Sequence, residues 1–106
     1  MHPTIAKKLP EIAEICSRYG VRRLELFGSA ARGVDFLPEH SDADFLVEFG
    51  PDNRDLGPLE RFFGFEQDLE RLLQRPVDLI ERNALENSRN YIRRRSIQRE
   101  LESVYG

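Results

Sequence analysis

Two stretches of the chain repeat apolar residues at the three- and four-residue spacing of an amphipathic helix. In the first stretch, charged residues separate five apolar positions: Ile5, Leu9, Ile12, Ala13 and Cys16. The pattern ends near Gly20, and Pro10 interrupts it. Because proline fits the first turn of a helix but disrupts its interior, the helix either begins at Pro10 or kinks there.

The second helical stretch opens at Gly57-Pro58 and stops at Arg75-Pro76. Its repeat consists of Leu59, Phe62, Phe63, Glu66, Leu69 and Leu73. This spacing places Phe62 and Phe63 on the apolar stripe, so we expect both in the core. Phe65 departs from the stripe and is the aromatic residue left as the candidate for exposure.

Three shorter stretches, residues 21–27, 41–49 and 77–81, have the alternation or the boundaries of strands. In residues 41–49 the apolar side chains share one face, and Asp42 and Asp44 share the opposite one. In residues 77–81, Asp78 points away from Val77 and Leu79. All three aspartates therefore project away from the expected core side.

These elements predict an α+β fold, in which a small mixed β-sheet carries helices packed on one face. The opposite face is expected to be open and to hold the three aspartates. The tail, from Asn87 or Ser88 to Tyr105, is expected to form a final helix. We expect one domain over residues 1–106, because a chain of this length buries one core and leaves nothing for a second lobe.

Composition narrows the class of protein. The chain has 16 Lys and Arg against 19 Asp and Glu, a net charge of −3, which argues against nucleic acid as the main partner. No stretch approaches the length of a membrane span, and the N-terminus has no apolar signal core, so we expect a cytoplasmic protein. The single Cys16 excludes an internal disulfide and makes zinc chemistry unlikely.

The most informative motif combines three parts of the chain. Residues 26–33 read Leu-Phe-Gly-Ser-Ala-Ala-Arg-Gly, residues 41–47 read Ser-Asp-Ala-Asp-Phe-Leu-Val, and residues 77–80 read Val-Asp-Leu-Ile. Together they resemble the nucleotidyltransferase superfamily of DNA polymerase beta, kanamycin nucleotidyltransferase and the poly(A) polymerases. The chain is most similar to the minimal nucleotidyltransferase (MNT) proteins, from about Arg22 onward.

The aspartates fit metal chemistry. Carboxylates two residues apart on a strand lie on one face, roughly 6 to 7 Å apart, so their oxygens can share metal ions. Mg²⁺ prefers hard oxygen ligands and combines one or two protein carboxylates with phosphates and water. The resemblance implies that Asp42, Asp44 and Asp78 are the catalytic metal ligands, with two Mg²⁺ ions and ATP or another nucleoside triphosphate.

The glycine-serine pair fits phosphate binding. Gly28 leaves room for a phosphate near the backbone, and Ser29 adds a hydroxyl at the expected start of a short helix. The resemblance implies that Gly28 and Ser29 bind the triphosphate. Arg32 is a secondary candidate for a charge-assisted phosphate contact.

Each of these residues alone also fits a structural role. Gly28-Ser29 fits a turn with a serine cap, Asp42 and Asp44 fit the solvated face of an edge strand, and Asp78 fits a surface acid. Considered together, three acids converging on one face repel one another, and a divalent cation relieves that repulsion. The run Arg93-Arg94-Arg95 fits either a solvated helix face or a contact with an acidic or nucleic-acid partner.

Three functions follow from the resemblance. The first is an enzyme that transfers AMP from ATP to a hydroxyl of a HEPN-type helical toxin, with this chain as the antitoxin. The second is an antitoxin that blocks its partner by contact alone, and the intact aspartate trio favours the enzyme over it. The third is an antibiotic-type nucleotidyltransferase in which two copies pair to complete a small-molecule pocket. No membrane partner is expected.

Overall fold

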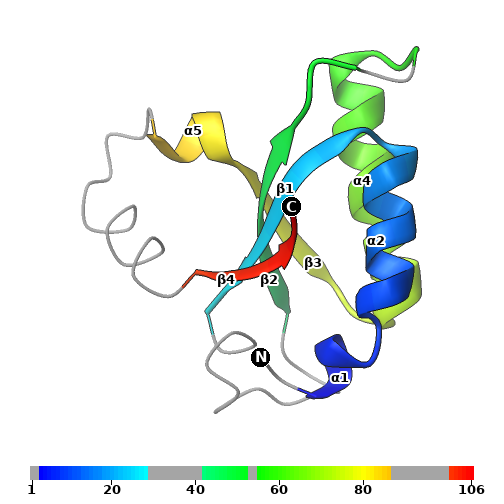
Figure 1. Cartoon of the computed structure of the whole chain (residues 1–106), viewed down its shortest axis with the longest axis vertical. Helices are drawn as coiled ribbons and strands as arrows, with labels where there is room; N and C mark the ends of the chain where they lie inside the picture. The colour runs from blue at the N-terminus through cyan, green and yellow to red at the C-terminus, as the bar shows by residue number, and fades with distance from the viewer. Residues whose placement is uncertain (1–2, 29–41, 53–54, 87–100) are drawn as a thin grey trace.

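A computed structural model describes residues 3–28, 42–52, 55–86 and 101–106 of the chain. Its helices are α1 (Pro3–Ala6), α2 (Leu9–Arg18), α4 (Pro58–Leu73) and α5 (Arg82–Glu86). Its strands are β1 (Val21–Phe27), β2 (Ala43–Phe49), β3 (Val77–Glu81) and β4 (Glu102–Tyr105). Figure 1 shows α2 and α4 side by side on one face of the sheet.

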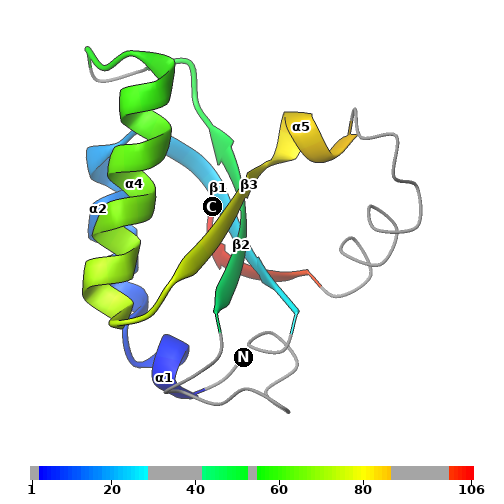
Figure 2. The same cartoon turned by 180° about the vertical axis from the view of Figure 1, so that it is seen from behind.

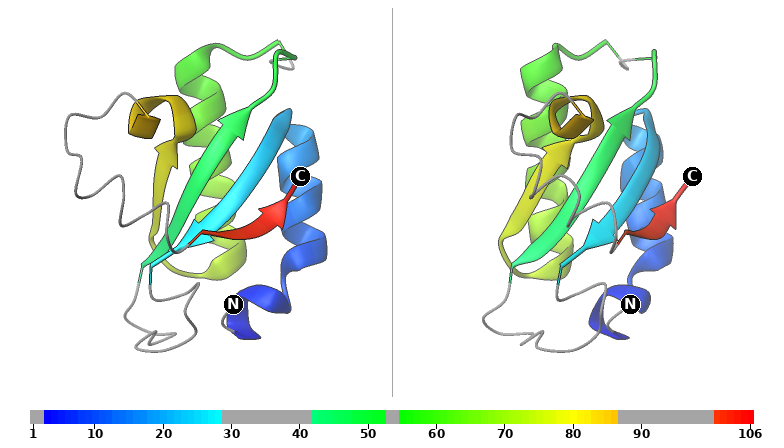
Figure 3. Two further views of the ribbon diagram at one scale, coloured as in Figure 1. Left: turned by 60° about the vertical axis from the view of Figure 1, so that its left-hand side comes forward. Right: turned by 90° about the vertical axis from the view of Figure 1, so that its left-hand side faces the viewer.

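The described strands form one mixed sheet in the order β3-β2-β1-β4. β1 pairs antiparallel with both β2 and β4, whereas β2 and β3 are parallel, as the α4 crossover between them allows. The predicted α+β class and mixed sheet are confirmed. The end of β1 and the beginnings of β2 and β3 meet at the same end of the sheet (Figure 3).

The helix boundaries follow the proline and glycine positions. Pro10 stands in the first turn of α2, and a separate short helix, α1, precedes it, so the chain breaks at the predicted point. Gly57 is the extended residue before α4, and Pro58 opens the helix. The helix ends at Gln74, which has φ 56° and ψ 42° and donates its N–H to the Glu70 carbonyl.

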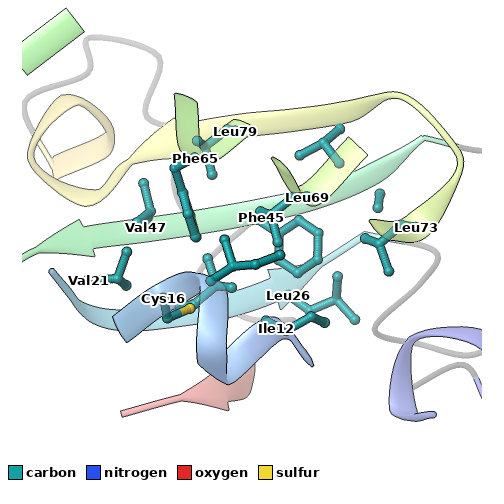
Figure 4. Packing of buried hydrophobic residues seen from close by; sticks show 14 of the residues in the cluster. Ile12, Cys16, Val21, Leu26, Phe45, Val47, Phe65, Leu69, Leu73 and Leu79 are labelled. Atoms are coloured by element: carbon teal, nitrogen blue, oxygen red, sulfur yellow. The ribbon is translucent and has the colours of Figure 1, made fainter. Parts of the chain in front are cut away.

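The main core lies between the sheet and the two long helices. Figure 4 shows side chains of β1, β2 and β3 interleaving with those of α2 and α4. Ile12, Leu26, Phe45 and Leu69 have no exposed surface. Apolar residues pack this face of the sheet because alternation along each strand directs every second side chain into it.

The predicted positions of Phe63 and Phe65 on α4 are wrong, whereas Phe62 packs against the main core as expected. Phe65 is fully buried and packs edge-on against the Tyr19 and Phe49 rings, with centroids 5.8 and 5.9 Å away. Phe63 is 51% exposed, and Phe62 is half-buried. The apolar residues of α4 are distributed over more than one side of the helix, so their spacing alone does not predict which side is buried.

Arg61 lies on the buried face of α4, together with Phe65, Leu69 and Leu73. Its side chain is buried, donates hydrogen bonds to four backbone carbonyl oxygens and stacks over the Phe49 ring at 4.5 Å. The acceptors are Tyr19 (2.7 Å), Gly20 (2.6 Å), Gly50 (2.9 Å) and Asp52 (3.0 Å). These bonds join α4 to the end of α2 and the end of β2.

The opposite face of the sheet is less open than expected. Phe27 and Leu46 are buried there, with Ile80 and Leu101 packed against them. Helix α5 contacts β2 and β3 on this side, opposite α2 and α4 (Figure 2). This second, smaller cluster therefore covers part of the face that carries the aspartates.

The predicted helix from residue 87 or 88 to Tyr105 is wrong at its end. Residues 102–105 form β4, which pairs with Leu24, Glu25 and Leu26 of β1. The free edge of β1 supplies hydrogen-bond partners that a local pattern cannot reveal. Residues 87–100 lie outside the described part, and within the described residues no helix is long and apolar enough to cross a membrane.

Candidate active site

Asp44 and Asp78 are neighbours on adjacent parallel strands. The register of β2 and β3 places them directly opposite each other, with backbones about 4.8 Å apart. Both point away from the main core, because Ala43, Phe45 and Leu79 on either side of them point into it. Asp78 is exposed, and Asp44 is half-buried. The structure therefore brings together two of the three predicted metal ligands.

Asp42 lies immediately before β2 and is exposed. The strand begins at Ala43, whose N–H donates to the Pro76 carbonyl at 3.0 Å. This bond aligns the beginnings of β2 and β3, so Asp42 lies at the same end of the sheet as Asp44 and Asp78. The predicted strand began one residue earlier than Asp42, at Ser41, which is not among the described residues.

Gly28 lies against Asp44 at the end of β1. Phe27, the last residue of β1, is paired with Asp44, and Gly28 follows with φ +74°. A Cβ atom at position 28 would approach Asp44 Oδ2 to 2.6 Å, which is closer than real Cβ contacts. The left-handed backbone conformation therefore favours glycine, and a larger residue would displace the Asp44 carboxylate. Ser29 and Arg32, the other predicted phosphate contacts, and the Arg93-Arg94-Arg95 run lie outside the described residues.

Two further acids approach the site from α4. The pKa of Glu66 is raised by burial, by the charge of Glu70 and by the charge of Asp78, in that order. Glu66 is thus close enough to Asp78 for their charges to interact. The helical repeat assigned Glu66 only to the α4 pattern, and no sequence signal connected it with the aspartates.

An ion pair crosses the sheet on the same face. Arg82, the first residue of α5, contacts Glu25 in β1, and their side chains are only 16% and 14% exposed. Glu25 pairs with Leu46, whereas Phe27 pairs with Asp44. The ion pair therefore lies two residues along the strands from Asp44, on the same face. No local sequence pattern indicates this contact, because Arg82 and Glu25 are far apart in the sequence and only the strand order β3-β2-β1 brings them together.

The carboxylates at this end of the sheet fit a divalent cation that binds together with a phosphate-bearing substrate. Within the described ranges no three His, Cys, Asp or Glu side chains form a ready metal-binding group. However, Mg²⁺ usually takes one or two protein carboxylates and fills its remaining positions with phosphate oxygens and water. Asp44 opposite Asp78, with the Asp44 carboxylate lying against the Gly28 backbone, supplies the two protein carboxylates.

Comparisons with known proteins define the class. The sequence signature of the nucleotidyltransferase domain family matches residues 9–102. Over 74 residues the chain is 38% identical to the protein adenylyltransferase MntA of Thermococcus cleftensis, which covers 70% of this chain and 69% of that protein. The chain therefore belongs to the nucleotidyltransferase domain family and is a nucleotidyltransferase enzyme, and the predicted resemblance is confirmed.

Solved structures agree with this assignment. A structure described as a minimal nucleotidyltransferase superposes with a TM-score of 0.70 at 28% identity, covering 96% of this chain and 95% of that one. A chain in the complex of tri-AMPylated Shewanella oneidensis HEPN toxin with MNT antitoxin superposes with a TM-score of 0.62 at 16% identity. That second match covers 95% of this chain and 71% of the other, and it shows a shared fold.

Proposed function

We propose that this chain is a Mg²⁺-dependent nucleotidyltransferase that transfers AMP from ATP to a hydroxyl of a HEPN-type toxin and so acts as its antitoxin. The observation that carries the proposal is the alignment of Asp44 with Asp78 beside the glycine at position 28. The similarity to MntA, a protein adenylyltransferase, supports the choice of AMP and of a protein acceptor. The fold shared with a chain of a toxin–antitoxin complex is consistent with the partner class.

In this proposal Asp44 and Asp78 hold Mg²⁺, and Asp42 is the third carboxylate at the same end of the sheet. Mg²⁺ supplies a lowered pKa for the attacking hydroxyl and stabilisation of the charge on the leaving pyrophosphate. Because Gly28 has no side chain, the Asp44 carboxylate can lie directly against its backbone. We further propose that Ser29 and Arg32, which follow Gly28 in sequence, contact the triphosphate.

The transfer balances as a single substitution at phosphorus. The acceptor hydroxyl oxygen forms a bond to the α-phosphorus of ATP, and the bond from that phosphorus to the pyrophosphate oxygen breaks. The hydroxyl proton is released, and the products are the AMP-modified acceptor and pyrophosphate. The role of the protein is to hold the carboxylates in register so that the reacting oxygen and phosphorus are aligned.

The experiment uses ATP labelled in the α-phosphate, Mg²⁺ and a purified HEPN-type helical protein as the acceptor. We expect label to become covalently attached to that protein, with release of pyrophosphate and loss of toxicity. Inhibition of the toxin without attached label would instead identify an antitoxin that acts by contact alone. A parallel reaction contains an aminoglycoside in place of the protein, and label transferred only to that small molecule would identify the antibiotic-type enzyme.

A further inference from the structure

One flank of α4 combines exposed apolar side chains with acids. This surface, the α4 flank, consists of Leu59, Phe63, Glu66 and Glu70. Leu59 is 71% exposed and Phe63 is 51% exposed, and these are the large apolar side chains that the described residues leave in water. They are one helical turn apart and therefore adjacent. Phe62 packs edge-on against Phe63, with ring centroids 5.4 Å apart, which holds the exposed ring in place.

Glu66 and Glu70 continue the flank along the helix, three and seven residues beyond Phe63. Both are half-buried. The charges of Glu70 and Asp78 raise the pKa of Glu66 in addition to burial, so the negative charge extends from α4 to the beginning of β3. Among the described residues, no ion pair involves Glu66 or Glu70. The flank is therefore apolar at one end and negatively charged at the other.

The flank leads to the candidate site. α4 packs against β3, the edge strand that carries Asp78, and Figure 2 shows the two elements on one side of the molecule. At about 1.5 Å per residue, the distance along α4 from Leu59 to Glu70 is about 16 Å, or three helical turns. A helix of similar length laid along the flank would end beside Asp78.

We propose that the α4 flank docks an amphipathic helix of the acceptor protein. That helix presents apolar side chains to Leu59 and Phe63, and Lys or Arg side chains to Glu66 and Glu70. Docked in this way, it delivers an acceptor hydroxyl to the end of the sheet where Asp44 and Asp78 lie. The inference rests on the proposed function and adds the surface and the chemistry that select the acceptor.

The charges favour such a partner over other occupants. If two copies paired through this flank in parallel, Glu66 and Glu70 of both copies would face one another. If they paired antiparallel, the carboxylates of each would lie against the apolar end of the other and lose their water. Nucleic acid and anionic lipid both carry negative charge, which the acidic end repels. A cationic, amphipathic helix satisfies both ends.

The test measures the affinity of the same HEPN-type protein for three double variants by isothermal titration calorimetry. Leu59→Ser with Phe63→Ser removes the apolar end, and Glu66→Lys with Glu70→Lys reverses the acidic end. Glu11→Lys with Glu14→Lys makes the same charge change on exposed residues of α2 and is the matched control. Circular dichroism melting tests whether each variant folds; Leu59 and Phe63 are 71% and 51% exposed, so their replacement leaves the main core in place.

We expect both flank variants to bind about tenfold or more weakly, and the α2 variant to bind as the wild type does. Flank variants that fold and bind as tightly as the wild type would overturn the docking surface, as would a wild-type chain that does not bind. Because binding needs no chemistry, the two proposals fail separately. Flank-dependent binding without AMP transfer leaves the docking surface intact and rejects the enzyme, whereas AMP transfer with flank-independent binding does the reverse.

Discussion

The two faces of the sheet differ in the role of their side chains: those of one face form the main core, and those of the other include the candidate metal ligands. On the face covered by α2 and α4, residues such as Leu24, Phe45 and Val47 are fully buried in one apolar core. On the other face, Asp44 and Asp78 lie side by side, a short step from the Arg82–Glu25 ion pair. Adjacent carboxylates repel each other and reduce the free energy of unfolding. The packed face fixes the strand register, and that register holds two like charges together on the other face.

The largest expected effect is on the rate of AMP transfer, and it comes from neutralising Asp44 on the face that carries the aspartates. Asp44→Asn keeps the shape of the side chain but removes a metal ligand, so we expect AMP transfer to fall about a thousandfold or more. The free energy of unfolding should stay equal or rise, because Asp78 loses a like-charged neighbour. Initial rates of label transfer and urea denaturation measure the two quantities.

The matched control for Asp44 is Glu48→Gln, on the same strand and the same face but four residues further along β2. It makes the same change of charge away from the beginning of the strand, and we expect the rate of transfer to be unchanged. Equal loss of activity in both variants would show that the overall negative charge of the face, rather than the position of Asp44, determines the rate.

Two phenylalanines on α4 test how this helix packs against the main core, because one is buried and the other is exposed. Phe65 is fully buried and Phe63 is 51% exposed. We expect Phe65→Ala to lower the free energy of unfolding by about 3–5 kcal/mol. Phe63→Ala should cost less than about 1 kcal/mol, since it loses mainly its contact with Phe62. Urea denaturation of both variants checks this difference, and equal costs would contradict the orientation of α4.

This pair of residues also shows where the sequence falls short. The boundaries of α4 were predictable from Gly57-Pro58 and Arg75-Pro76, which are local signals. The buried face was not, because Leu59, Phe62, Phe63 and Phe65 distribute apolar surface around the helix. On the face that is buried, Arg61 donates hydrogen bonds to carbonyl groups that other segments supply, such as those of Tyr19 and Gly50, and these partners are not visible in the local sequence. The same reason explains β4, whose hydrogen-bond partners lie on β1.

For the candidate site, alternation along each strand correctly placed Asp44 and Asp78 on the face opposite the main core. Their direct pairing was not predictable, because it depends on the strand order and on the register that the Ala43–Pro76 hydrogen bond helps to set. Glu66 and the Arg82–Glu25 pair carry no local signature at all. The assignment of metal and phosphate contacts, including Ser29 and Arg32, stays a prediction.

Gly28 connects the packed part of the sheet with the candidate site, since it directly follows β1 and lies against Asp44. Gly28→Ala adds a Cβ atom 2.6 Å from Asp44 Oδ2 and retains a backbone with φ +74°. We expect a loss of about 1–2 kcal/mol in stability from the left-handed conformation. Displacement of the Asp44 carboxylate should lower the rate of transfer about a hundredfold.

The control for Gly28 is Gly57→Ala. Gly57 precedes α4 with φ −68°, and the nearest atom to an added Cβ is 4.0 Å away. This change should leave transfer unaffected. Denaturation and label transfer measured on both variants separate the two effects at position 28. A Gly28→Ala chain that loses stability but transfers AMP normally would show that the glycine serves only the turn.

The effect that is smallest at neutral pH is a titration on the packed face, where burial raises the pKa of the Cys16 thiol from 9.0 to about 12. The folded chain therefore holds the proton more tightly than the unfolded one. The resulting stability is fully present below pH 9.0 and is lost as the pH rises toward about 12. We expect the free energy of unfolding to fall by about 1.4 kcal/mol per pH unit in that window. Cys16→Ala should remove this part of the slope, while Tyr19, whose pKa is raised by burial and by Asp68, continues to contribute. Urea denaturation of both chains between pH 8 and pH 11 measures the difference. Identical slopes of the free energy of unfolding against pH would show that the thiol is not buried in the main core.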